Sequence, residues 1–316
     1  MVLGKHMINA GVQPPVPCPV CGSADTIDCG PPVYRKPTEV AGVPIDLSDL
    51  NLRHRRCQVC EYRFVFPPPL ERLMDCYRRS ARQWGTGAHV VEKRFYARKK
   101  ALLEKYAPAK SALDFGCYEG GFLLYLGAEW RKAGIEPSSD AANVARAAGV
   151  EIIGPTLDTI DSTTYAGQFG AVIILDVMEH IPDPVGDLSK LREFLMPGGI
   201  VLIETGDAGS RDFVRFGHRH PYCGIAEHIG FFSRKSLQAA AGRAGFTLES
   251  FEPSMQWDYT DGAWRFPWYV RAYRLLRLLH AMHVPMTNRI RDLAEGPYPR
   301  APNLYDHFLA VLRREE

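Results

Sequence analysis

Short apolar runs alternate with amphipathic stretches from residue 111 onward. Each apolar run is bounded by glycine, proline or polar positions and has the length of a buried strand. The runs are SALDFGC, KAGIEP, VEII, FGAVIILD, GIVLIET, FTLESFEP and HFLAVLRR. Between them, residues 120–131, 139–148, 184–196 and 233–244 space their apolar positions as helices do. This pattern predicts an α/β protein with a doubly wound, mostly parallel, seven-stranded sheet.

The part of the chain before this sheet is organised differently. Residues 1–17 are rich in proline and glycine, a composition that predicts a disordered tail. Residues 18–69 contain paired cysteines and end at a stiff proline triplet. Residues 70–110 hold two charged helical stretches, which we expect to connect this module to the sheet and to cap the substrate site. The sheet domain then takes residues 111–316, with a helical insertion at 257–302.

Two C-x-x-C pairs stand in the N-terminal module, Cys18 with Cys21 and Cys57 with Cys60. A gap of two residues lets one tight turn direct both sulfurs at one ion, and four thiolates are a common tetrahedral zinc set. A redox-active C-x-x-C is the alternative, but redox chemistry requires only one pair. The doubled motif therefore predicts one structural zinc ion held by these four cysteines.

Composition narrows the class of protein. Of the 316 residues, 46% are hydrophobic and 23% are charged, which is ordinary for a water-soluble globular protein. A net charge of +2 offers no basic surplus for contacts with phosphates, so we expect no nucleic-acid partner. No apolar run reaches the roughly 20 residues of a membrane helix. The first residues, MVLGKHMINAG, lack the apolar core of a signal peptide, and we expect a cytoplasmic protein.

One segment of the predicted insertion has a different character. Residues 264–282, WRFPWYVRAYRLLRLLHAM, place Arg271, Arg274 and Arg277 on one side of a helix and apolar residues on another. A basic amphipathic helix with aromatic residues is suited to peripheral contact with a membrane or with a lipid-linked glycan. The alternative is a lid over the substrate or a helix at a homodimer interface.

The first predicted strand runs into Gly116-Cys117-Tyr118-Glu119-Gly120, a loop of the kind that holds nucleotides. No Gly-Lys-Ser/Thr follows it, which excludes a Walker A loop. A dinucleotide fingerprint has glycine where Tyr118 stands, and the Glu119 carboxylate would repel a phosphate. The loop therefore favours a nucleoside ligand without phosphate. A carboxylate about 20 residues further along accepts ribose hydroxyls in such folds, and Glu136 stands there.

Three later segments resemble successive blocks of class I S-adenosylmethionine-dependent methyltransferases. They are FGAVIILDVMEHIPDP, LREFLMPGGIVLIET and HIGFFSRKSLQAAAGRAGF. The module CPVCGS…RCQVCEYRFVFPPP, joined to such a domain, resembles bacterial methyltransferases of sugar, polysaccharide and secondary-metabolite pathways. The resemblance covers residues 95–256 and resumes at NLYDHFLAVLRR. It implies the Rossmann-like class I fold, with S-adenosylmethionine as the cofactor.

The same resemblance implies roles for residues at the carboxyl ends of the strands. Glu136 would hold the ribose of the cofactor, and the turn at Thr156 and Leu157 would flank the adenine. The methionine half would lie against the glycine loop and the end of the fourth strand. The residues implied there are Asp114, Gly116, Cys117, Tyr118, Gly120 and Asp176.

Two histidines follow glutamates where the family builds its active site, as Glu179-His180 and Glu227-His228. A sugar hydroxyl is a weak acid, so we expect a histidine general base, with the adjacent glutamate orienting it. His228 is favoured as the base. The Glu179-His180 pair also stands at the end of a predicted strand, and its alternative role is to cap the loop that follows this strand. In ubiquinone-type catechol O-methyltransferases a similar stretch can bind a divalent metal, which implies an Mg²⁺ site at Asp176, Glu179 and His180.

These observations predict an S-adenosylmethionine-dependent O-methyltransferase that acts on a hydroxyl of a small, nucleotide-linked or lipid-linked sugar or glycan. The resembling deoxysugar C-methyltransferases carry a Tyr-x-Glu-His stretch, whereas this chain has Ile225-Ala226-Glu227-His228, which favours O-methylation. Methylation at carbon of a keto-deoxysugar and phenolic O-methylation are the alternatives. From another class, the alternative is a zinc-module nucleic-acid binder or an RNA methyltransferase.

Overall fold

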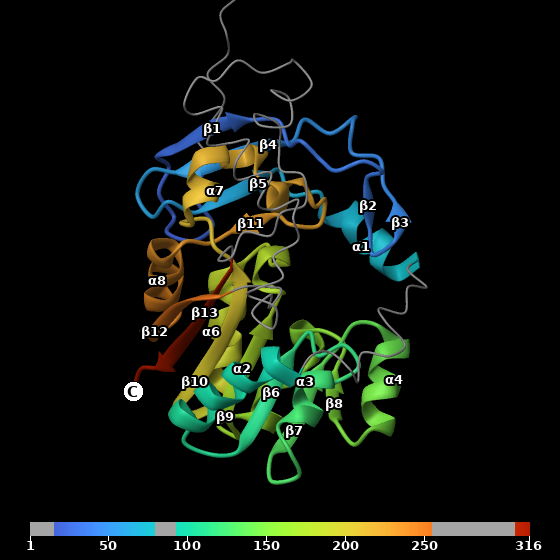
Figure 1. Ribbon diagram of the computed structural model, residues 1–316, viewed down its shortest axis with the longest axis vertical. Coiled ribbons are helices and arrows are strands. Elements are labelled where there is room, and N and C mark those ends of the chain that lie inside the picture. The colour runs from blue at the N-terminus through green and yellow to red at the C-terminus, as the bar shows by residue number, and fades with distance from the viewer. Residues whose placement is uncertain (1–15, 80–92, 255–306) are drawn as a thin grey trace, which may run out of the picture.

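The strands predicted from the alternating pattern form one sheet in the computed structural model, which describes residues 16–79, 93–254 and 307–316 (Figure 1). In chain order they are β6 (Ser111–Phe115), β7 (Arg131–Ile135), β8 (Glu151–Gly154), β9 (Phe169–Leu175), β10 (Leu195–Gly206), β12 (Phe246–Ser254) and β13 (His307–Arg314). Across the sheet the order is β12-β13-β10-β9-β6-β7-β8. Only β13 runs antiparallel to its neighbours, β10 and β12. The predicted doubly wound, seven-stranded fold is confirmed.

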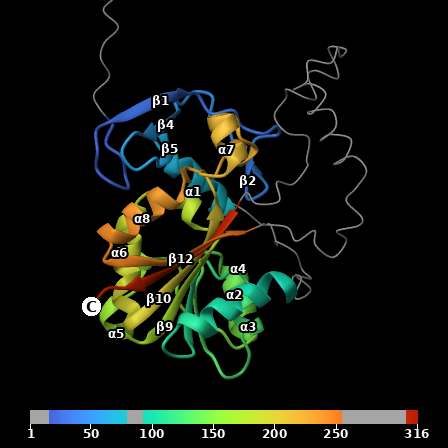
Figure 2. The ribbon, with the colours of Figure 1, turned by 60° about the vertical axis from the view of Figure 1, so that its left-hand side comes forward.

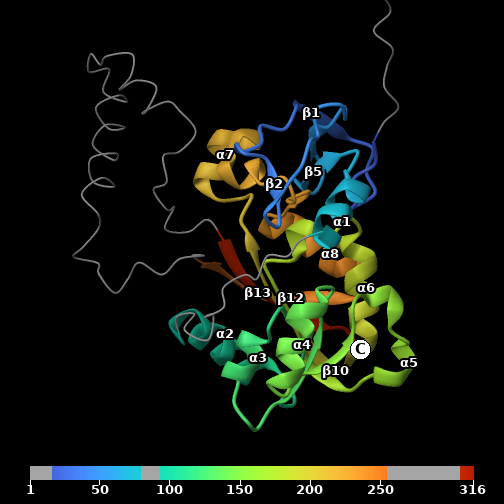
Figure 3. The same cartoon turned by 90° about the vertical axis from the view of Figure 1, so that its right-hand side faces the viewer.

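Helices cover both faces of this sheet (Figures 2 and 3). One face carries α2 (Lys93–Tyr106), α3 (Gly121–Tyr125) and α4 (Ser139–Ala147), and the other carries α5 (Ser162–Tyr165), α6 (Pro184–Phe194) and α8 (Arg234–Arg243). Helix α3 is shorter than the 120–131 that the spacing predicts. Gly127 has a φ of +104°, so the right-handed helix ends before it.

The cysteine module is a second, antiparallel sheet. Its strands are β1 (Thr26–Gly30), β4 (Arg53–Cys57) and β5 (Arg63–Phe66), and a short hairpin of β2 (Glu39–Val40) and β3 (Val43–Pro44) lies beside α1 (Leu70–Arg79). The fourth strand comes from far along the chain, because β11 (Gly230–Phe231) pairs with β5. The connection from β10 to β11 contains α7 (Arg211–Phe216), η4 (Gly217–Arg219) and η5 (Pro221–Gly224).

This module sits at the carboxyl ends of the central strands (Figure 1). The short helix η3 (Met178–His180) follows β9 there. The N–H of Ile229 donates to the carbonyl of Glu179 at 2.9 Å, and the N–H of Val65 donates to the carbonyl of Ile229 at 2.9 Å. One residue therefore links the end of β9 to β5 of the module. This arrangement places the module over the edge where such sheets bind ligands.

Some predictions fall outside the described residues. These are the tail over residues 1–15, and the insertion at 257–302 with its basic helix at 264–282. Val16, at the inner end of the predicted tail, is buried, and its carbonyl accepts a hydrogen bond from Thr26 at 2.8 Å. Among the helices of the described ranges, none combines the length and the apolar character that crossing a bilayer requires.

Candidate functional site

The loop between β6 and α3 needs its glycines. Gly116 and Gly120 have φ values of +83° and +77°, which L side chains rarely adopt. A Cβ on Gly116 would lie 2.7 Å from Cγ2 of Val177, and one on Gly120 would lie 2.8 Å from Cγ2 of Val150. Tyr118 also has a positive φ, +50°. The loop therefore turns tightly against the residue that follows Asp176, and its backbone is drawn close to the end of β9.

Glu136 connects this loop to the start of α4. Its Oε2 accepts from the N–H of Tyr118 at 2.8 Å, and its Oε1 accepts from the N–H of Ser138 at 2.8 Å. Burial raises the pKa of Glu136, and the two backbone donors oppose that rise. A carboxylate has about four lone-pair sites, so two remain for hydroxyl donors of a ligand. This geometry fits the predicted ribose clamp.

Asp114 lies one residue before the end of β6, near Glu136, and is 4% exposed. Burial, and then the charge of Glu136, raise the pKa of Asp114 to about 8. Two buried carboxyl groups that repel each other favour a ligand that brings positive charge. The predicted cofactor carries such charge on its sulfonium and ammonium groups, so the donor set fits it.

Three further residues, Cys117, Thr156 and Leu157, are also predicted to contact the cofactor. The thiol of Cys117 points into the sheet, because a Cβ on Gly134 would lie 2.4 Å from its Sγ. The Cys117 thiol is therefore used in packing, and the Cys117 N–H and carbonyl bond Ile135 and Gly120. Thr156 caps η2 (Leu157–Thr159), and Leu157 is buried in the core. Their place beside an adenine stays a prediction.

Asp176 follows β9 with a φ of +53°. Its Oδ1 is buried without a hydrogen-bond partner among the described residues and lies 3.8 Å from Nε2 of His307. Burial, and then the charges of Glu179 and Glu204, raise the pKa of Asp176 to about 7. Asp176 is half-buried and is a second acid at the sheet edge that would hold cationic groups.

The two Glu-His pairs differ in how the glutamate is used. Nδ1 of His180 lies 3.0 Å from the carbonyl oxygen of Glu227, and the Glu227 carboxylate accepts from the hydroxyl of Tyr77 at 3.0 Å. The Glu179 carboxylate instead faces His228, with Oε1 at 3.9 Å from Nε2. A carboxylate oxygen of Glu179 lies within 4.8 Å of a ring nitrogen of His180 and of His228, so Glu179 serves both imidazoles, and the backbone of the Glu227 segment holds the His180 ring.

The hydrogen bonds define which ring nitrogen carries the proton. Nδ1 of His228 lies 3.0 Å from the carbonyl of Tyr222, and a carbonyl only accepts. Nδ1 of His180 and Nδ1 of His228 therefore both donate, and in the neutral form of either ring Nε2 carries the lone pair. The rings lie 5.0 Å apart, edge to face. Burial, and then the charge of His180, lower the pKa of His228 to about 3, which keeps it neutral.

Three of these side chains are close enough to share a cation. Glu179, His180 and His228 each offer one ligand atom, and the three atoms lie within 4.8 Å of one another. The implied metal set of Asp176, Glu179 and His180 is corrected in one member, since His228 replaces Asp176. Asp176 turns instead toward His307.

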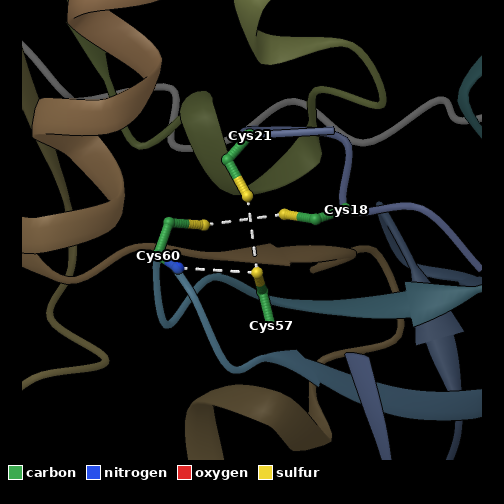
Figure 4. A group of neighbouring side chains, drawn as sticks. All are labelled: Cys18, Cys21, Cys57 and Cys60. Carbon is green, nitrogen blue, oxygen red and sulfur yellow. Dashed lines mark hydrogen bonds between the residues drawn. The ribbon is translucent and has the colours of Figure 1, made fainter. Parts of the chain in front are cut away.

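The four module cysteines converge as predicted (Figure 4). Sγ of Cys18 lies 3.6 Å from Sγ of Cys60, Sγ of Cys21 lies 3.4 Å from Sγ of Cys57, and all four sulfurs lie within 4.8 Å of one another. Zn–S bonds of about 2.3 Å in a tetrahedron place sulfurs about 3.8 Å apart. The cluster therefore has the shape of a four-thiolate zinc site.

Sequence reasoning missed two members of the site, Thr205 and Tyr222. Thr205 lies near the end of β10, and Tyr222 lies on η5. Both hydroxyls bond Glu179, at 2.7 and 2.5 Å. No motif spacing joins three segments so far apart, although Tyr222 stands in the same HRHPYCGIAEH stretch as His228.

Comparison with known proteins identifies a family for this chain. Residues 88–250, more than half of the chain, match the family model described as a methyltransferase domain. Two curated relatives are both ubiquinone biosynthesis O-methyltransferases. The protein of Marinobacter nauticus is 33% identical over 116 residues, which are 33% of this chain and 48% of that protein. The protein of Cereibacter sphaeroides is 34% identical over 111 residues, which are 32% of this chain and 43% of that protein.

The chain thus spans about half the length of the curated relatives it matches. Among solved structures, the chain is similar to a SAM-dependent methyltransferase from Archaeoglobus fulgidus. The TM-score is 0.44 at 14% identity, over 72% of this chain and 100% of that one.

Proposed function

Because this chain belongs to the methyltransferase-domain family, we propose that it is an S-adenosylmethionine-dependent O-methyltransferase whose acceptor is a hydroxyl of a sugar or glycoconjugate. The proposal depends mainly on one observation, the closeness of the glycine loop to the two imidazoles. A glycine loop clamped by Glu136 and two imidazoles with Nε2 lone pairs stand at the same edge of the sheet, where β6 and β9 lie side by side.

The cofactor residues would act by charge and by hydrogen bonds. S-adenosylmethionine, when bound, supplies a methyl group already activated for transfer. Glu136 would accept the ribose hydroxyls through its remaining lone pairs. Asp114 and Asp176, whose pKa values burial raises, would ionise fully beside the positive groups of the cofactor.

We assign the general base to His180. His180 is half-buried and can reach an acceptor, whereas His228 is 6% exposed. A pKa of about 3 makes His228 a weak base for a hydroxyl proton. The carbonyl of Glu227 would hold the His180 ring so that Nε2 takes the proton while the acceptor oxygen attacks the methyl carbon. His228 would help to fix that ring from its edge.

Transfer to oxygen is favoured over transfer to carbon. Methylation at carbon in the resembling enzymes uses a tyrosine base. Burial, and then the charges of Glu179 and Asp176, raise the pKa of Tyr222 well above 10. Its hydroxyl is also bonded to Glu179. Tyr222 would therefore stay protonated and hold Glu179 in place.

The cysteine module supports a sugar acceptor through its resemblance to enzymes of sugar pathways. We propose that Cys18, Cys21, Cys57 and Cys60 hold a structural zinc ion there, since their sulfurs have tetrahedral spacing. The ion would bind the turn before β1 to the turn between β4 and β5. It would take no part in the chemistry.

A phenolic acceptor is the second candidate, and one observation favours it. Glu179, His180 and His228 can hold a divalent cation, and the curated relatives are named for ubiquinone biosynthesis. A cation there would bind phenol oxygens and lower their pKa. His180 would then be a ligand instead of a base.

A methyl-transfer screen with isotope-labelled cofactor against nucleotide sugars, glycans and catechols, read by mass spectrometry, tests both candidates. We expect a sugar product that forms equally well in EDTA. His180→Gln should lower kcat by about 10²–10⁴ and leave cofactor affinity unchanged. A catechol product that EDTA abolishes and Mg²⁺ restores would establish the second candidate. An unchanged rate in His180→Gln would reject the base.

A further inference from the structure

Two arginines face each other on the module sheet. Arg56 of β4 is paired in register with Arg63 of β5. Like charges at directly opposite positions destabilise a sheet. Burial, and then the charge of Arg56, lower the pKa of Arg63. Both side chains are half-buried, so water screens the repulsion poorly. Cζ of Arg63 lies over the Phe213 ring, 5.6 Å from its centroid, and this contact offsets part of the cost.

The neighbouring carboxylates of the described residues are bound elsewhere. Asp28 accepts from Nε of Arg53 at 3.1 and 2.8 Å. Glu61 accepts from Lys235 at 3.2 Å. Nε of Arg56 is buried and, within the described ranges, has no hydrogen-bond partner. A buried donor without an acceptor is costly, and more so when it is charged.

His54 adds an independent unpaired donor. It lies two residues before Arg56 on β4, and thus on the same face. It is 2% exposed, and its Nε2 has no hydrogen-bond partner in the parts of the chain that the structure describes. Burial, and then the charges of His218 and Arg63, lower the pKa of His54 to about 3. The neutral ring can donate one N–H without adding charge.

We propose that Arg56, Arg63 and His54 form a binding site for a phosphate or diphosphate group. The guanidinium fork matches phosphate oxygens, and an anion between the arginines replaces their repulsion with attraction. Ile27, in register with Arg56 on β1, is 42% exposed, so solvent reaches this face of the sheet.

The phosphate site adjoins the catalytic segment through three ring contacts. The centroid of His54 lies 5.4 Å from that of Phe231, Phe231 lies 6.1 Å from Tyr222, and Tyr222 lies 4.2 Å from His228. A diphosphate bound here would anchor an acceptor whose sugar extends toward the imidazoles. The acceptor class is then a nucleoside-diphosphate-linked sugar. This last step rests on the proposed function, whereas the phosphate site does not.

The test is titration calorimetry of the full chain at low salt without a methyl donor. The probes are inorganic pyrophosphate, a nucleoside diphosphate and a nucleoside-diphosphate sugar. We expect saturable binding that Arg56→Gln and Arg63→Gln each weaken about tenfold or more. Arg55→Gln is the matched control, because it removes the same charge from the opposite face of β4, where Arg55 bonds Thr26. The affinity of the Arg55→Gln variant for the three probes should equal that of the parent protein.

Tighter binding of the nucleotide forms than of pyrophosphate would identify the acceptor as the source of the anion. Equal binding would identify a free phosphate anion. The absence of saturable binding to the parent protein, or an equal loss in Arg55→Gln, would overturn the site. If the glutamine variants do not fold, Arg56→Lys is used to test the site. This variant keeps the positive charge but lacks the guanidinium group that can bind two phosphate oxygens. Methyl transfer is not measured, so failure of the proposed function leaves this result intact.

Discussion

Tyr222 donates its phenolic hydrogen to Oε1 of Glu179 across 2.5 Å, from a segment 43 residues further along the chain. Thr205 donates to the other carboxylate oxygen at 2.7 Å, and the N–H of Gly206 donates to the Tyr222 oxygen at 3.1 Å. Burial would raise the pKa of Glu179, but the imidazoles of His180 and His228 and the two hydroxyls lower it. Glu179 is therefore a fixed, buried anion beneath the histidines.

Tyr222→Phe should lower the free energy of unfolding by about 1–3 kcal/mol, because Oε1 of Glu179 loses the hydroxyl that bonds it and the N–H of Gly206 loses its acceptor. Chemical denaturation measures this loss. Tyr165→Phe is the matched control, since the Tyr165 ring packs near Phe169 and its hydroxyl makes no hydrogen bond to the described residues. It should change stability by less than about 0.5 kcal/mol. Equal effects would contradict the role of the Tyr222 hydroxyl.

Glu136→Gln should weaken binding of S-adenosylmethionine by about 1.5–3 kcal/mol, because the neutral amide loses charge-assisted hydrogen bonds. The amide would also turn its NH₂ toward the N–H of Tyr118 or of Ser138, where an acceptor is required. Calorimetry measures the affinity. Glu151→Gln on β8 is the control, since the Glu151 side chain bonds Arg131 alone among the described residues, at the exposed start of the strand. Unchanged affinity in Glu136→Gln would show that this carboxylate does not hold the cofactor.

Because the carboxyl group of Asp114 is buried, we expect its contribution to the free energy of unfolding to fall as the pH rises. Its pKa is about 8 in the folded protein, against about 3.9 in an unfolded chain. Between these values the folded state holds a proton that the unfolded state has lost. The contribution of Asp114 to the free energy of unfolding is thus fully present below about pH 4, and it is lost as the pH rises through about 8.

Asp114→Asn has no proton to lose. Relative to the parent, its free energy of unfolding should rise with pH across that window, by at most about 1.4 kcal/mol per pH unit. Denaturation series at several pH values give the difference directly. A difference that does not vary with pH would mean that Asp114 titrates normally.

Purified protein should contain about one zinc ion per chain, and Cys57→Ser should lose it or fail to fold. Elemental analysis by mass spectrometry measures the metal content. Cys29→Ser is the control, because Cys29 is a free cysteine outside the four-sulfur cluster, and it should keep its zinc. A disulfide within the cluster, or full zinc content in Cys57→Ser, would contradict the site.

The sequence predicts the central sheet well, because parallel strands buried on both faces must be continuous apolar runs. Strand β9, for example, is FGAVIIL, and its first six residues are fully buried. The module strands carry no such pattern. Strand β4 reads RHRRC, and it pairs with β1 and β5 close to the four cysteines. Local hydrophobic spacing cannot reveal a strand in which four of the five residues are charged or histidine.

The candidate site is predictable in its residues but not in their partners. His180 and His228 do meet at the sheet edge, as the resemblance implies. Which glutamate faces which histidine depends on backbone turns, such as the positive φ of Asp176 and the short helix η3. Those turns arise from packing against the connection after β10, which sequence spacing does not encode.

The pairing of β11 with β5 has a consequence for biosynthesis. A ribosome releases the N-terminal module first, yet the strand that completes its sheet lies far toward the other end of the chain. Until then β5 is an open edge with unpaired backbone groups, and Val65 lacks the carbonyl of Ile229. The N-terminal module is therefore synthesised first, but its sheet is completed late. A chaperone that binds the exposed edge of β5 during translation would shield these unpaired backbone groups.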